Sequence, residues 1–225
     1  MGNGRIKMIG AQLGLVAAAF LLGSVLFSYH LPKWLRHVDV VRDSADHNPG
    51  TANALVLAGV PVGMLCLTLD MAKGFLPVWL GVRLWGLRFA LLPLLMAAPV
   101  LGHAFSPWYP FRGGKAIATA FGVLLGLAPS NWAVLLLGFW YVLFSTVIVI
   151  MPHERRSVMA FFYFAVSCTV TAFLTHSYAL LPGLMLVAAV PIYKNGKDLK
   201  RIYREKLAAE ALTEQKNGQG EKEKG

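Results

Sequence analysis

Apolar runs separated by short polar segments make up most of this chain. Seven of these runs predict helices, at about residues 8–27, 52–78, 87–101, 116–127, 132–151, 158–174 and 180–192. An α-helix needs about 20 apolar residues to cross the hydrocarbon core of a bilayer, and the helices of soluble domains usually keep a polar face. We therefore predict an all-α integral membrane protein with about seven transmembrane helices in one bundle.

The pattern becomes polar after residue 193. The segment from Lys197 to Thr213 can form an amphipathic helix at the bilayer surface, and the last dozen residues have the low hydrophobicity of a disordered segment. We expect residues 1–204 to form the membrane domain and residues 205–225 to form a polar, partly disordered cytoplasmic tail.

The charge distribution predicts an orientation in the membrane. The net charge is +10, yet the basic residues lie at helix ends and in the tail, as the positive-inside rule and anionic headgroups favour. We therefore expect no nucleic-acid partner. In a seven-helix bundle the segments 29–51, 102–115 and 152–157 share one side with the tail and hold most of the Lys and Arg. This side is predicted to be cytoplasmic, with the N-terminus outside and the C-terminus in the cytoplasm.

The most distinctive polar stretch has the sequence LGHAFSPWYPFRGGKAIAT, at residues 101–119. Gly113 and Gly114 leave backbone N–H groups free to approach a ligand closely. Lys115 adds a positive charge at the start of the next helix, where the helix dipole favours anions. We interpret this stretch as a phosphate-binding loop at the membrane edge. The alternative is an ordinary helix start with snorkelling basic side chains.

Three further side chains extend this candidate site. Arg112 precedes the two glycines and adds a cation, and Thr119 adds a hydroxyl about one turn after the lysine. His103 lies just before the loop. It can contact the same anion or simply lie at the headgroup boundary.

A second polar cluster, HNPGTAN, precedes a predicted helix. Asn48 and Asn53 supply amide donors, Thr51 supplies a hydroxyl, and Gly50 exposes its backbone. These groups suit a second wall of a phosphate cradle, and the alternative is an N-capped turn without a ligand. Arg42, a short distance upstream, can reach the same anion as a forked donor.

Two other charged groups remain. Asp70 and Lys73 are three residues apart on one helix face and predict a structural ion pair, with a polar transport path as the alternative. Asn195 and Asp198 can close the site from the tail, or they belong to a basic stretch on the membrane surface. No motif in the sequence specifies a nucleophile or a general base.

Taken in order, these clusters resemble the motifs of the bacterial acyl-phosphate:glycerol-3-phosphate acyltransferases of the PlsY type. GHAFSPWYPFRGGKAIAT resembles Gly-His-x-Phe-Pro…Phe-Lys-Gly-Gly-Lys-Gly-Val-Ala-Thr, and HNPGTANAL resembles Gly-Ser-Gly-Asn-Pro-Gly-Ala-Thr-Asn-Val-Leu. DMAKGFLPV resembles Asp-x-x-Lys-Gly-x-Leu-Pro-Val, and NGKDLKRIY lies where the family has His-x-x-Asn-Ile-x-Arg-Leu. The resemblance extends to about Arg204.

The resemblance implies a seven-helix enzyme of the bacterial inner membrane, with its site facing the cytoplasm. Such an enzyme transfers a fatty acyl group from acyl phosphate to the 1-hydroxyl of glycerol 3-phosphate, giving lysophosphatidic acid and phosphate for phospholipid synthesis. No cofactor and no metal is implied. The phosphate of the donor can itself take the hydroxyl proton, so the protein mainly supplies positioning and anion stabilisation.

The family motifs also imply roles for particular residues. Lys115 is the implied main cation for phosphate, with His103 in a supporting role. The implied substrate and phosphate contacts are Arg42, Asn48, Gly50, Thr51, Asn53, Arg112, Gly113, Gly114, Lys115, Thr119, Asn195 and Asp198.

The sequence departs from the family pattern at two walls of this site. Asp46 replaces the serine of Gly-Ser-Gly, and the hydroxyl of Ala-Thr-Asn moves by one place to Thr51. Asn195 and Asp198 align with the family's His and Asn, so a cationic group is lost and an acid is gained. The alternative function is therefore a divergent, non-catalytic paralogue that binds acyl phosphate or phospholipid headgroups.

Overall fold

The computed structural model describes residues 2–109 and 113–222, and every regular element in these two ranges is a helix. In chain order the elements are α1 (Gly2–Ser24), α2 (Phe27–Arg36), α3 (Val40–Asp43), α4 (Thr51–Ala58), α5 (Val60–Trp85), α6 (Leu92–Ala104), α7 (Ile117–Leu125), α8 (Ala133–Val142), the π-helical turn η1 (Leu143–Val147), α9 (His153–Leu174) and α10 (Leu181–Lys222). The all-α prediction is confirmed.

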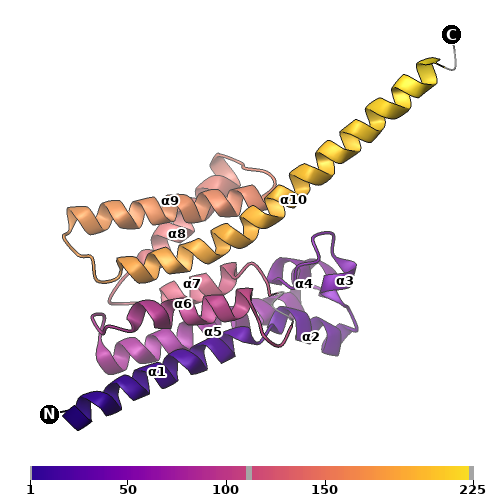
Figure 1. Cartoon of the computed structure of the whole chain (residues 1–225). Coiled ribbons are helices and arrows are strands. Elements are labelled where there is room, and N and C mark those ends of the chain that lie inside the picture. Colours follow the sequence, from indigo (N-terminus) through magenta and orange to yellow (C-terminus); the bar gives the residue numbers. More distant parts are fainter. Residues whose placement is uncertain (1, 110–112, 223–225) are drawn as a thin grey trace.

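Most of the helices run side by side in one bundle (Figure 1). α1 packs against α6, α5 against α7, and α9 against α10, while α10 also contacts α6. The short helices α2, α3 and α4 gather at one end of the bundle, where α10 leaves it and continues beyond (Figure 1). We call this the α4 end. It receives the loops that precede α4, α7 and α9, and these loops carry the candidate site.

Three helical segments are long and apolar enough to cross a membrane: Gly4–Ser24, Val60–Trp85 and His153–Leu174. Two shorter apolar helices cover Leu92–Ala104 and Ala133–Val147. Large apolar side chains are exposed on many of these helices, as expected of surfaces that face lipid. The described residues therefore have the character of an integral membrane protein. Length and composition identify three spans, where the sequence predicts about seven.

The interior of the bundle is closely packed. Its main apolar core joins Leu95 and Met96 of α6, Phe161 and Phe164 of α9, and Leu184 of α10. In a bilayer such packing contacts, rather than exclusion of water, hold helices together. The core therefore fixes α6, α9 and α10 relative to one another, and each of these helices brings a residue to the α4 end.

Several predicted helices have different limits in the structure. The predicted helix at 52–78 is divided at Gly59, whose φ of 88° is left-handed. The break gives α4 and α5, and α5 then continues to Trp85. The predicted helix at 132–151 ends earlier, in the turn η1 at Val147. The break at Gly59 separates the start of α4, with its polar residues, from the long apolar helix that follows.

The end of the chain also differs from the prediction. α10 runs unbroken through Pro191 to Lys222, where we expected a helix ending near Ile192 and a separate surface helix. A transmembrane helix tolerates an internal proline when neighbouring helices compensate for the lost hydrogen bond, and α10 packs against both α6 and α9. The polar residues after 193 therefore continue the last apolar helix.

Candidate functional site

The glycine loop, residues 113–116, lies directly against the end of α6. A Cβ added to Gly113 would collide with the carbonyl oxygen of His103, and one added to Gly114 would collide with the His103 ring. Only glycine allows the backbone to approach so closely. The loop thereby brings Lys115 to the α4 end of the bundle. Arg112 lies outside the described residues.

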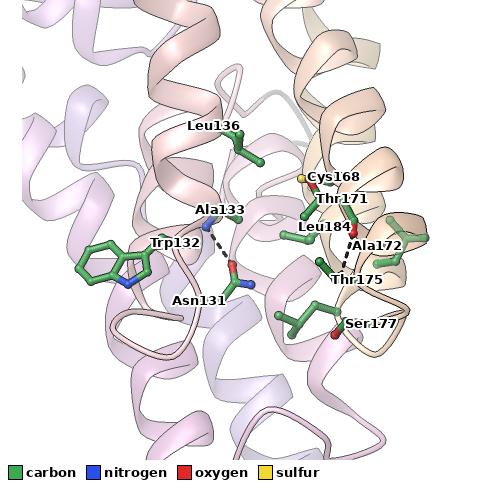
Figure 2. A pocket seen from close by; sticks show the side chains of 12 residues that line it. Asn131, Trp132, Ala133, Leu136, Cys168, Thr171, Ala172, Thr175, Ser177 and Leu184 are labelled. Carbon is green, nitrogen blue, oxygen red and sulfur yellow. Dashed lines mark hydrogen bonds between the residues drawn. The ribbon is translucent and has the colours of Figure 1, made fainter.

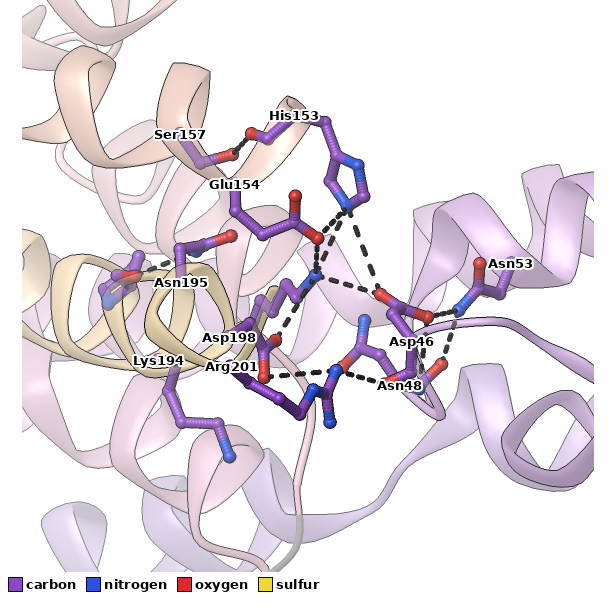
Figure 3. Close-up of polar contacts among 12 residues, drawn as sticks. Asp46, Asn48, Asn53, His153, Glu154, Ser157, Lys194, Asn195, Asp198 and Arg201 are labelled. Atoms are coloured by element: carbon purple, nitrogen blue, oxygen red, sulfur yellow. Dashed lines mark hydrogen bonds and ion pairs between the residues drawn. The ribbon is translucent and has the colours of Figure 1, made fainter. Parts of the chain in front are cut away.

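Lys115 lies among three carboxylates from separate parts of the chain. Its Nζ is 2.9 Å from Asp46 Oδ2, 3.0 Å from Glu154 Oε1 and 3.4 Å from Asp198 Oδ2. These acids come from the loop before α4, from the first turn of α9 and from α10, and they point toward one another (Figure 3). His153 Nε2 is 3.2 Å from the same Nζ. We call these five residues the Lys115 cluster.

The surroundings of Lys115 and of Asp46 favour the charged form of each side chain. Burial alone would lower the pKa of Lys115, but the Asp46 and Glu154 carboxylates outweigh burial and hold that pKa above its usual range. Burial also acts to raise the pKa of Asp46, but hydrogen bonds from Lys115 and Asn53 hold it below its usual range. One ammonium therefore faces three carboxylates, and one of these, Asp198, also lies 3.7 Å from the Arg201 guanidinium.

The spacing of three of these side chains also suits a metal ion. One ligand atom from each of Asp46, His153 and Glu154 lies within 4.8 Å of the others. Lys115 Nζ contacts all three groups. The ammonium therefore takes the central position that a metal cation would have, and it partly neutralises the carboxylates.

Asp46 is fixed by the start of α4. Asn53 donates from Nδ2 to Asp46 Oδ1 at 2.7 Å and to the Asn48 carbonyl oxygen at 2.8 Å. The Asn48 backbone N–H donates to the same carboxylate at 3.3 Å, and Arg201 of α10 donates to the Asp46 carbonyl oxygen at 3.3 Å. Through Asp46 the two predicted walls of the site, before α4 and before α7, form one network.

Lys194 ties α10 to the glycine loop. Its Nζ donates to the carbonyl oxygens of Ala104 and Gly113, each at 3.0 Å. Ala104 is the last residue of α6, and a cation at this position satisfies a carbonyl that the helix leaves unpaired. The position of the loop therefore depends on α10.

A polar cavity of about 600 Å³ opens beside the cluster at the α4 end. Its lining includes four basic side chains, those of Arg42, Lys194, Lys197 and Arg201. The rest of the lining is Asp39, Val41, Asp46, His47, Asn48, Pro49, Tyr109, Gly113 and Asp198. Convergent basic side chains at the mouth of a bundle suit a small anionic ligand.

A second cavity, of about 680 Å³, is mostly apolar. Its apolar lining comes from Leu55, Leu67, Met71, Ile117, Phe121 and Tyr141, and polar residues at its border include Gly50, Thr51, Asn53, His103, Lys115 and His153. Asp46 and Asn48 line both cavities. The Lys115 cluster therefore lies where an apolar cavity meets a basic one.

A second ion pair lies deeper in the bundle. Asp70 and Lys73 of α5 are 2.8 Å apart, and their side chains are 0% and 1% exposed. Ser28 and Thr51 donate their hydroxyls to Asp70 Oδ2 at 2.6 Å and 3.4 Å. The contacts agree with the predicted structural ion pair. The Thr51 hydroxyl, which we expected at the substrate, is directed to this pair.

The structure brings most of the predicted site residues together. Those that line one or both cavities are Arg42, Asn48, Gly50, Thr51, Asn53, His103, Gly113, Lys115 and Asp198. Arg42 lies away from the cluster, because its guanidinium pairs with the neighbouring Asp43 at 2.7 Å. Gly114 contributes by its contact with His103 rather than by lining a cavity.

Two further predicted residues, Thr119 and Asn195, line neither cavity. Thr119 is fully buried and lines neither cavity, because this face of α7 packs closely against Gly74 of α5. Asn195 is also fully buried, and it donates from Nδ2 to the Pro191 carbonyl oxygen at 2.8 Å within its own helix. Both side chains therefore support the packing around the site in this structure.

His153 and Glu154 are site residues that the sequence reasoning missed. We interpreted the segment 152–157 as a charged cytoplasmic loop, but His153 is the first residue of α9 and Glu154 is only 1% exposed. The available signal was an acid beside a histidine in a segment that is otherwise basic. A buried acid requires a cationic partner, and Lys115 meets that requirement.

A third cavity, of about 240 Å³, lies between α8, α9 and α10, near the turn that joins α9 to α10 (Figure 2). None of its twelve lining residues is charged. Two of its polar groups are satisfied locally: Asn131 Oδ1 accepts from the Ala133 N–H at 2.8 Å, and the Thr175 hydroxyl donates to the Thr171 carbonyl at 2.7 Å. The cavity therefore lacks the charged groups that mark the α4 end.

Comparison with known proteins gives one consistent result. The sequence model of a family described as glycerol-3-phosphate acyltransferase matches residues 13–205. The glycerol-3-phosphate acyltransferase of Pasteurella multocida is 34% identical over 194 residues, covering 83% of this chain and 87% of that protein. The glycerol-3-phosphate acyltransferase of Trichlorobacter lovleyi is 38% identical over 192 residues, covering 85% of this chain and 94% of that protein.

Solved structures agree with the sequence comparisons. The crystal structure of PlsY, an integral membrane glycerol 3-phosphate acyltransferase, in its glycerol 3-phosphate form has a TM-score of 0.74 and 27% identity. The match covers 87% of this chain and 93% of that one. The lysophosphatidic acid form of the same protein gives a TM-score of 0.73 with the same coverage.

Proposed function

This chain belongs to the glycerol-3-phosphate acyltransferase family, and we propose that it transfers a fatty acyl group from acyl phosphate to the 1-hydroxyl of glycerol 3-phosphate. The products are lysophosphatidic acid and phosphate. One observation carries the proposal: an apolar cavity and a basic cavity meet at the Lys115 cluster. A reaction that joins a fatty acyl group to a small phosphorylated alcohol needs such a junction.

The apolar cavity is assigned to the acyl chain of the donor. It lies among α4, α5, α7 and α8, and its volume of about 680 Å³ is of the size that accommodates a small ligand. The acyl phosphate group then lies at the polar border, beside Lys115 and the backbone of Gly50.

The basic cavity is assigned to glycerol 3-phosphate. Arg201 and Arg42 can form forked contacts with a phosphate, and Lys194 and Lys197 add charge. Asn48, which lines both cavities, is placed between the acceptor hydroxyl and the donor. We propose that the two remaining predicted contacts, Asn53 and Gly113, hold the boundary between the two cavities in place.

Catalysis on this assignment depends on positioning and anion stabilisation. The attacking hydroxyl and the acyl carbon are held on opposite sides of the junction. Lys115 then stabilises the negative charge on the departing phosphate. For this step the ammonium has to exchange one or more of its carboxylate contacts for the phosphate, and the basic side chains of the neighbouring cavity offset the repulsion between that anion and the acids.

We also propose the orientation predicted from the charge distribution. The α4 end faces the cytoplasm of a bacterial cell, the N-terminus is outside, and seven segments cross the inner membrane. Single-cysteine variants at Ser130 and at Ala45, which are both exposed, test this orientation in intact cells. A membrane-impermeant thiol reagent should label the first and spare the second, in a background without the two native cysteines.

A turnover assay tests the proposed reaction. Purified protein in detergent is incubated with palmitoyl phosphate and glycerol 3-phosphate, with the Pasteurella multocida relative alongside. We expect lysophosphatidic acid and equimolar phosphate. Binding of acyl phosphate without product, while the relative turns over, would overturn the proposal and favour the non-catalytic alternative. The comparisons give no support to that alternative.

A further inference from the structure

The apolar cavity is lined by three hydrogen-bond donors that the proposed reaction has not yet used. They belong to Tyr141 of α8 and to His153 and Arg156 in the first turn of α9. For each of these donors the described residues provide no acceptor. A buried donor without an acceptor is rare in proteins, because an unpaired polar group costs free energy. The three donors together therefore indicate a ligand that carries acceptor oxygens.

Tyr141 supplies the buried donor. Its ring contacts those of Phe121 and Phe161, with centroids 5.6 Å and 5.9 Å away. Its hydroxyl oxygen is buried and has no hydrogen-bond partner among the described residues. Ser157 lies nearby but outside hydrogen-bond geometry, and it donates its own hydroxyl to the His153 carbonyl oxygen at 2.9 Å. The packing of the ring thus fixes a hydroxyl that is available to a ligand.

His153 supplies a second donor, at Nδ1. Lys115 donates to its Nε2 at 3.2 Å, and an ammonium group can only donate. A neutral ring therefore carries its proton on Nδ1, and a positively charged ring carries a proton there as well. Nδ1 is on the side of the ring that is turned away from Lys115 (Figure 3). His153 therefore offers an N–H from this atom in either protonation state.

Arg156 supplies the third donor and a positive charge. It follows His153 by three residues, so the two side chains share one face of α9. Its side chain is partly buried, and no described carboxylate lies within ion-pair distance of its guanidinium. It is close enough to Tyr141 to act electrostatically on the hydroxyl. One unpaired guanidinium beside two neutral donors suits a phosphate group.

We propose that Arg156, His153 and Tyr141 form the subsite for the phosphate group of the acyl donor. This inference rests on the function proposed above, and it specifies which side chains hold the donor at the polar border of its cavity. Lys115 lines the same cavity and contacts the His153 ring. The donor phosphate is therefore placed between Lys115 and Arg156.

The subsite gives each cavity its own cations. The polar cavity has four basic side chains, and the apolar cavity has Lys115 and Arg156. Lys115 is already paired with three carboxylates, whereas Arg156 is paired with none in the part of the chain that the structure describes. A donor phosphate that comes close to the acids of the Lys115 cluster is therefore attracted chiefly by Arg156. Two substrates that each carry a phosphate can then bind at once.

A binding experiment tests the subsite without depending on turnover. The probe is the β-ketophosphonate analogue of palmitoyl phosphate, which keeps the chain and the phosphate charge but cannot transfer its acyl group. Calorimetry in detergent micelles measures its dissociation constant. We expect Arg156→Gln, which removes a charge-assisted contact, to raise this constant by about 10- to 100-fold. Tyr141→Phe should raise it by about two- to ten-fold, and Arg156→Lys should recover part of the loss.

Arg155→Gln is the matched control. Arg155 is the neighbour of Arg156 in the chain, but it is exposed and lines neither cavity, so this variant should bind the analogue within about two-fold of wild type. Equal losses in the two variants would show a general effect of charge and would overturn the proposal. A ten-fold excess of phosphatidylglycerol should leave the affinity unchanged. Displacement of the analogue by this lipid would assign the three donors to a lipid headgroup instead.

Steady-state kinetics separates this inference from the proposed function. If the wild-type chain makes lysophosphatidic acid, Arg156→Gln should raise the KM for palmitoyl phosphate by at least about ten-fold and leave the KM for glycerol 3-phosphate within about three-fold. Turnover combined with analogue binding that neither Arg156→Gln nor Tyr141→Phe weakens would overturn the subsite and leave the function intact. Analogue binding that requires Arg156 in a chain without turnover would overturn the function and leave the subsite intact. A wild-type chain that does not bind the analogue would overturn the subsite.

Discussion

Two lysines, each paired with acids, lie in different surroundings in this protein. Lys73 has one carboxylate, Asp70 at 2.8 Å, and it also donates to the Val25 carbonyl at 2.6 Å. Both side chains of this pair are almost completely buried. Lys115 has three carboxylates within 3.4 Å and lines the apolar cavity, and two of these carboxylates, those of Asp46 and Asp198, line the polar cavity.

The difference shows which of the two lysines can exchange its partners. The Lys73 pair is balanced in charge and closed to solvent, so replacing either partner would leave a buried charge uncompensated. The Lys115 cluster lies beside a cavity lined by four basic side chains, so an anion can approach it and take over part of the contact with the ammonium. We therefore assign a structural role to the first lysine and a ligand-binding role to the second.

The largest expected effect is on the stability of the protein and concerns the buried pair of Asp70 and Lys73. Lys73→Met leaves Asp70 charged and buried, which costs about 3–5 kcal/mol. The apparent free energy of unfolding, measured by SDS titration in detergent micelles, should fall by that amount. Lys206→Met is the matched control, because Lys206 is 71% exposed and pairs with Glu210 at 3.7 Å. A similar loss in both variants would remove the distinction between the pairs.

The second effect is on catalytic activity and concerns the Lys115 cluster. Lys115→Met removes the cation assigned to the departing phosphate, and loss of one such contact costs about 10²–10³-fold in rate. We expect kcat/KM for palmitoyl phosphate to fall by that factor, while Lys206→Met stays near wild type. Unchanged steady-state kinetics in Lys115→Met would contradict the assignment of this residue.

A smaller effect should follow from removing one surplus acid. Asp198→Asn restores the residue type of the family motif and releases Lys115 from one carboxylate at 3.4 Å. Because the Asp198 side chain is 23% exposed, we discount the gain to about 1 kcal/mol or less, which corresponds to a KM for glycerol 3-phosphate lowered by about five-fold. Glu210→Gln, twelve residues further along α10 and paired with the exposed Lys206, is the control. A raised KM would show that Asp198 itself holds substrate.

The smallest effect concerns pH. The pKa of Asp46 is lowered, so its stabilising contribution is present above its unfolded value of about 3.9 and is lost only as pH falls through the folded value. The pKa of Lys115 is raised, so its contribution is present below about 10.4 and is lost as pH rises through the folded value. Between pH 6 and 8 neither group titrates. Asp46→Asn should therefore change kcat/KM by the same factor at pH 6 and at pH 8, and factors that differ by more than about three-fold would show that Asp46 titrates in this range.

Short local patterns in the sequence predicted much of the candidate site. The adjacent Gly113 and Gly114 predicted a close backbone approach, and the structure shows that approach against His103. The polar residues after Asp46 predicted a second wall, and Asn53 joins that wall to Lys115 through the Asp46 carboxylate. These signals were readable because each depends on a few neighbouring residues.

The parts that could not be predicted depend on contacts between distant segments. In the sequence Glu154 resembles an ordinary loop acid. In the structure α9 places its carboxylate 3.0 Å from Lys115 Nζ. In the sequence the hydroxyl of Thr119 resembles a ligand contact. In the structure the face of α7 that carries Thr119 packs against α5. The continuity of α10 through Pro191 depends on its packing against α6 and α9, which a local pattern of apolar and polar residues does not contain.

The contribution of α10 to the candidate site also determines the stage of synthesis at which that site can form. Lys194, Asp198 and Arg201 all lie on this helix, which follows the other described helices in chain order. Chains are synthesised from the N-terminus and tend to fold in that order, so a nascent protein has α1 to α9 before it has these three side chains. Until α10 docks, the glycine loop lacks its tie to α6. The proposed substrate site can therefore form only after α10 has joined the helices made before it.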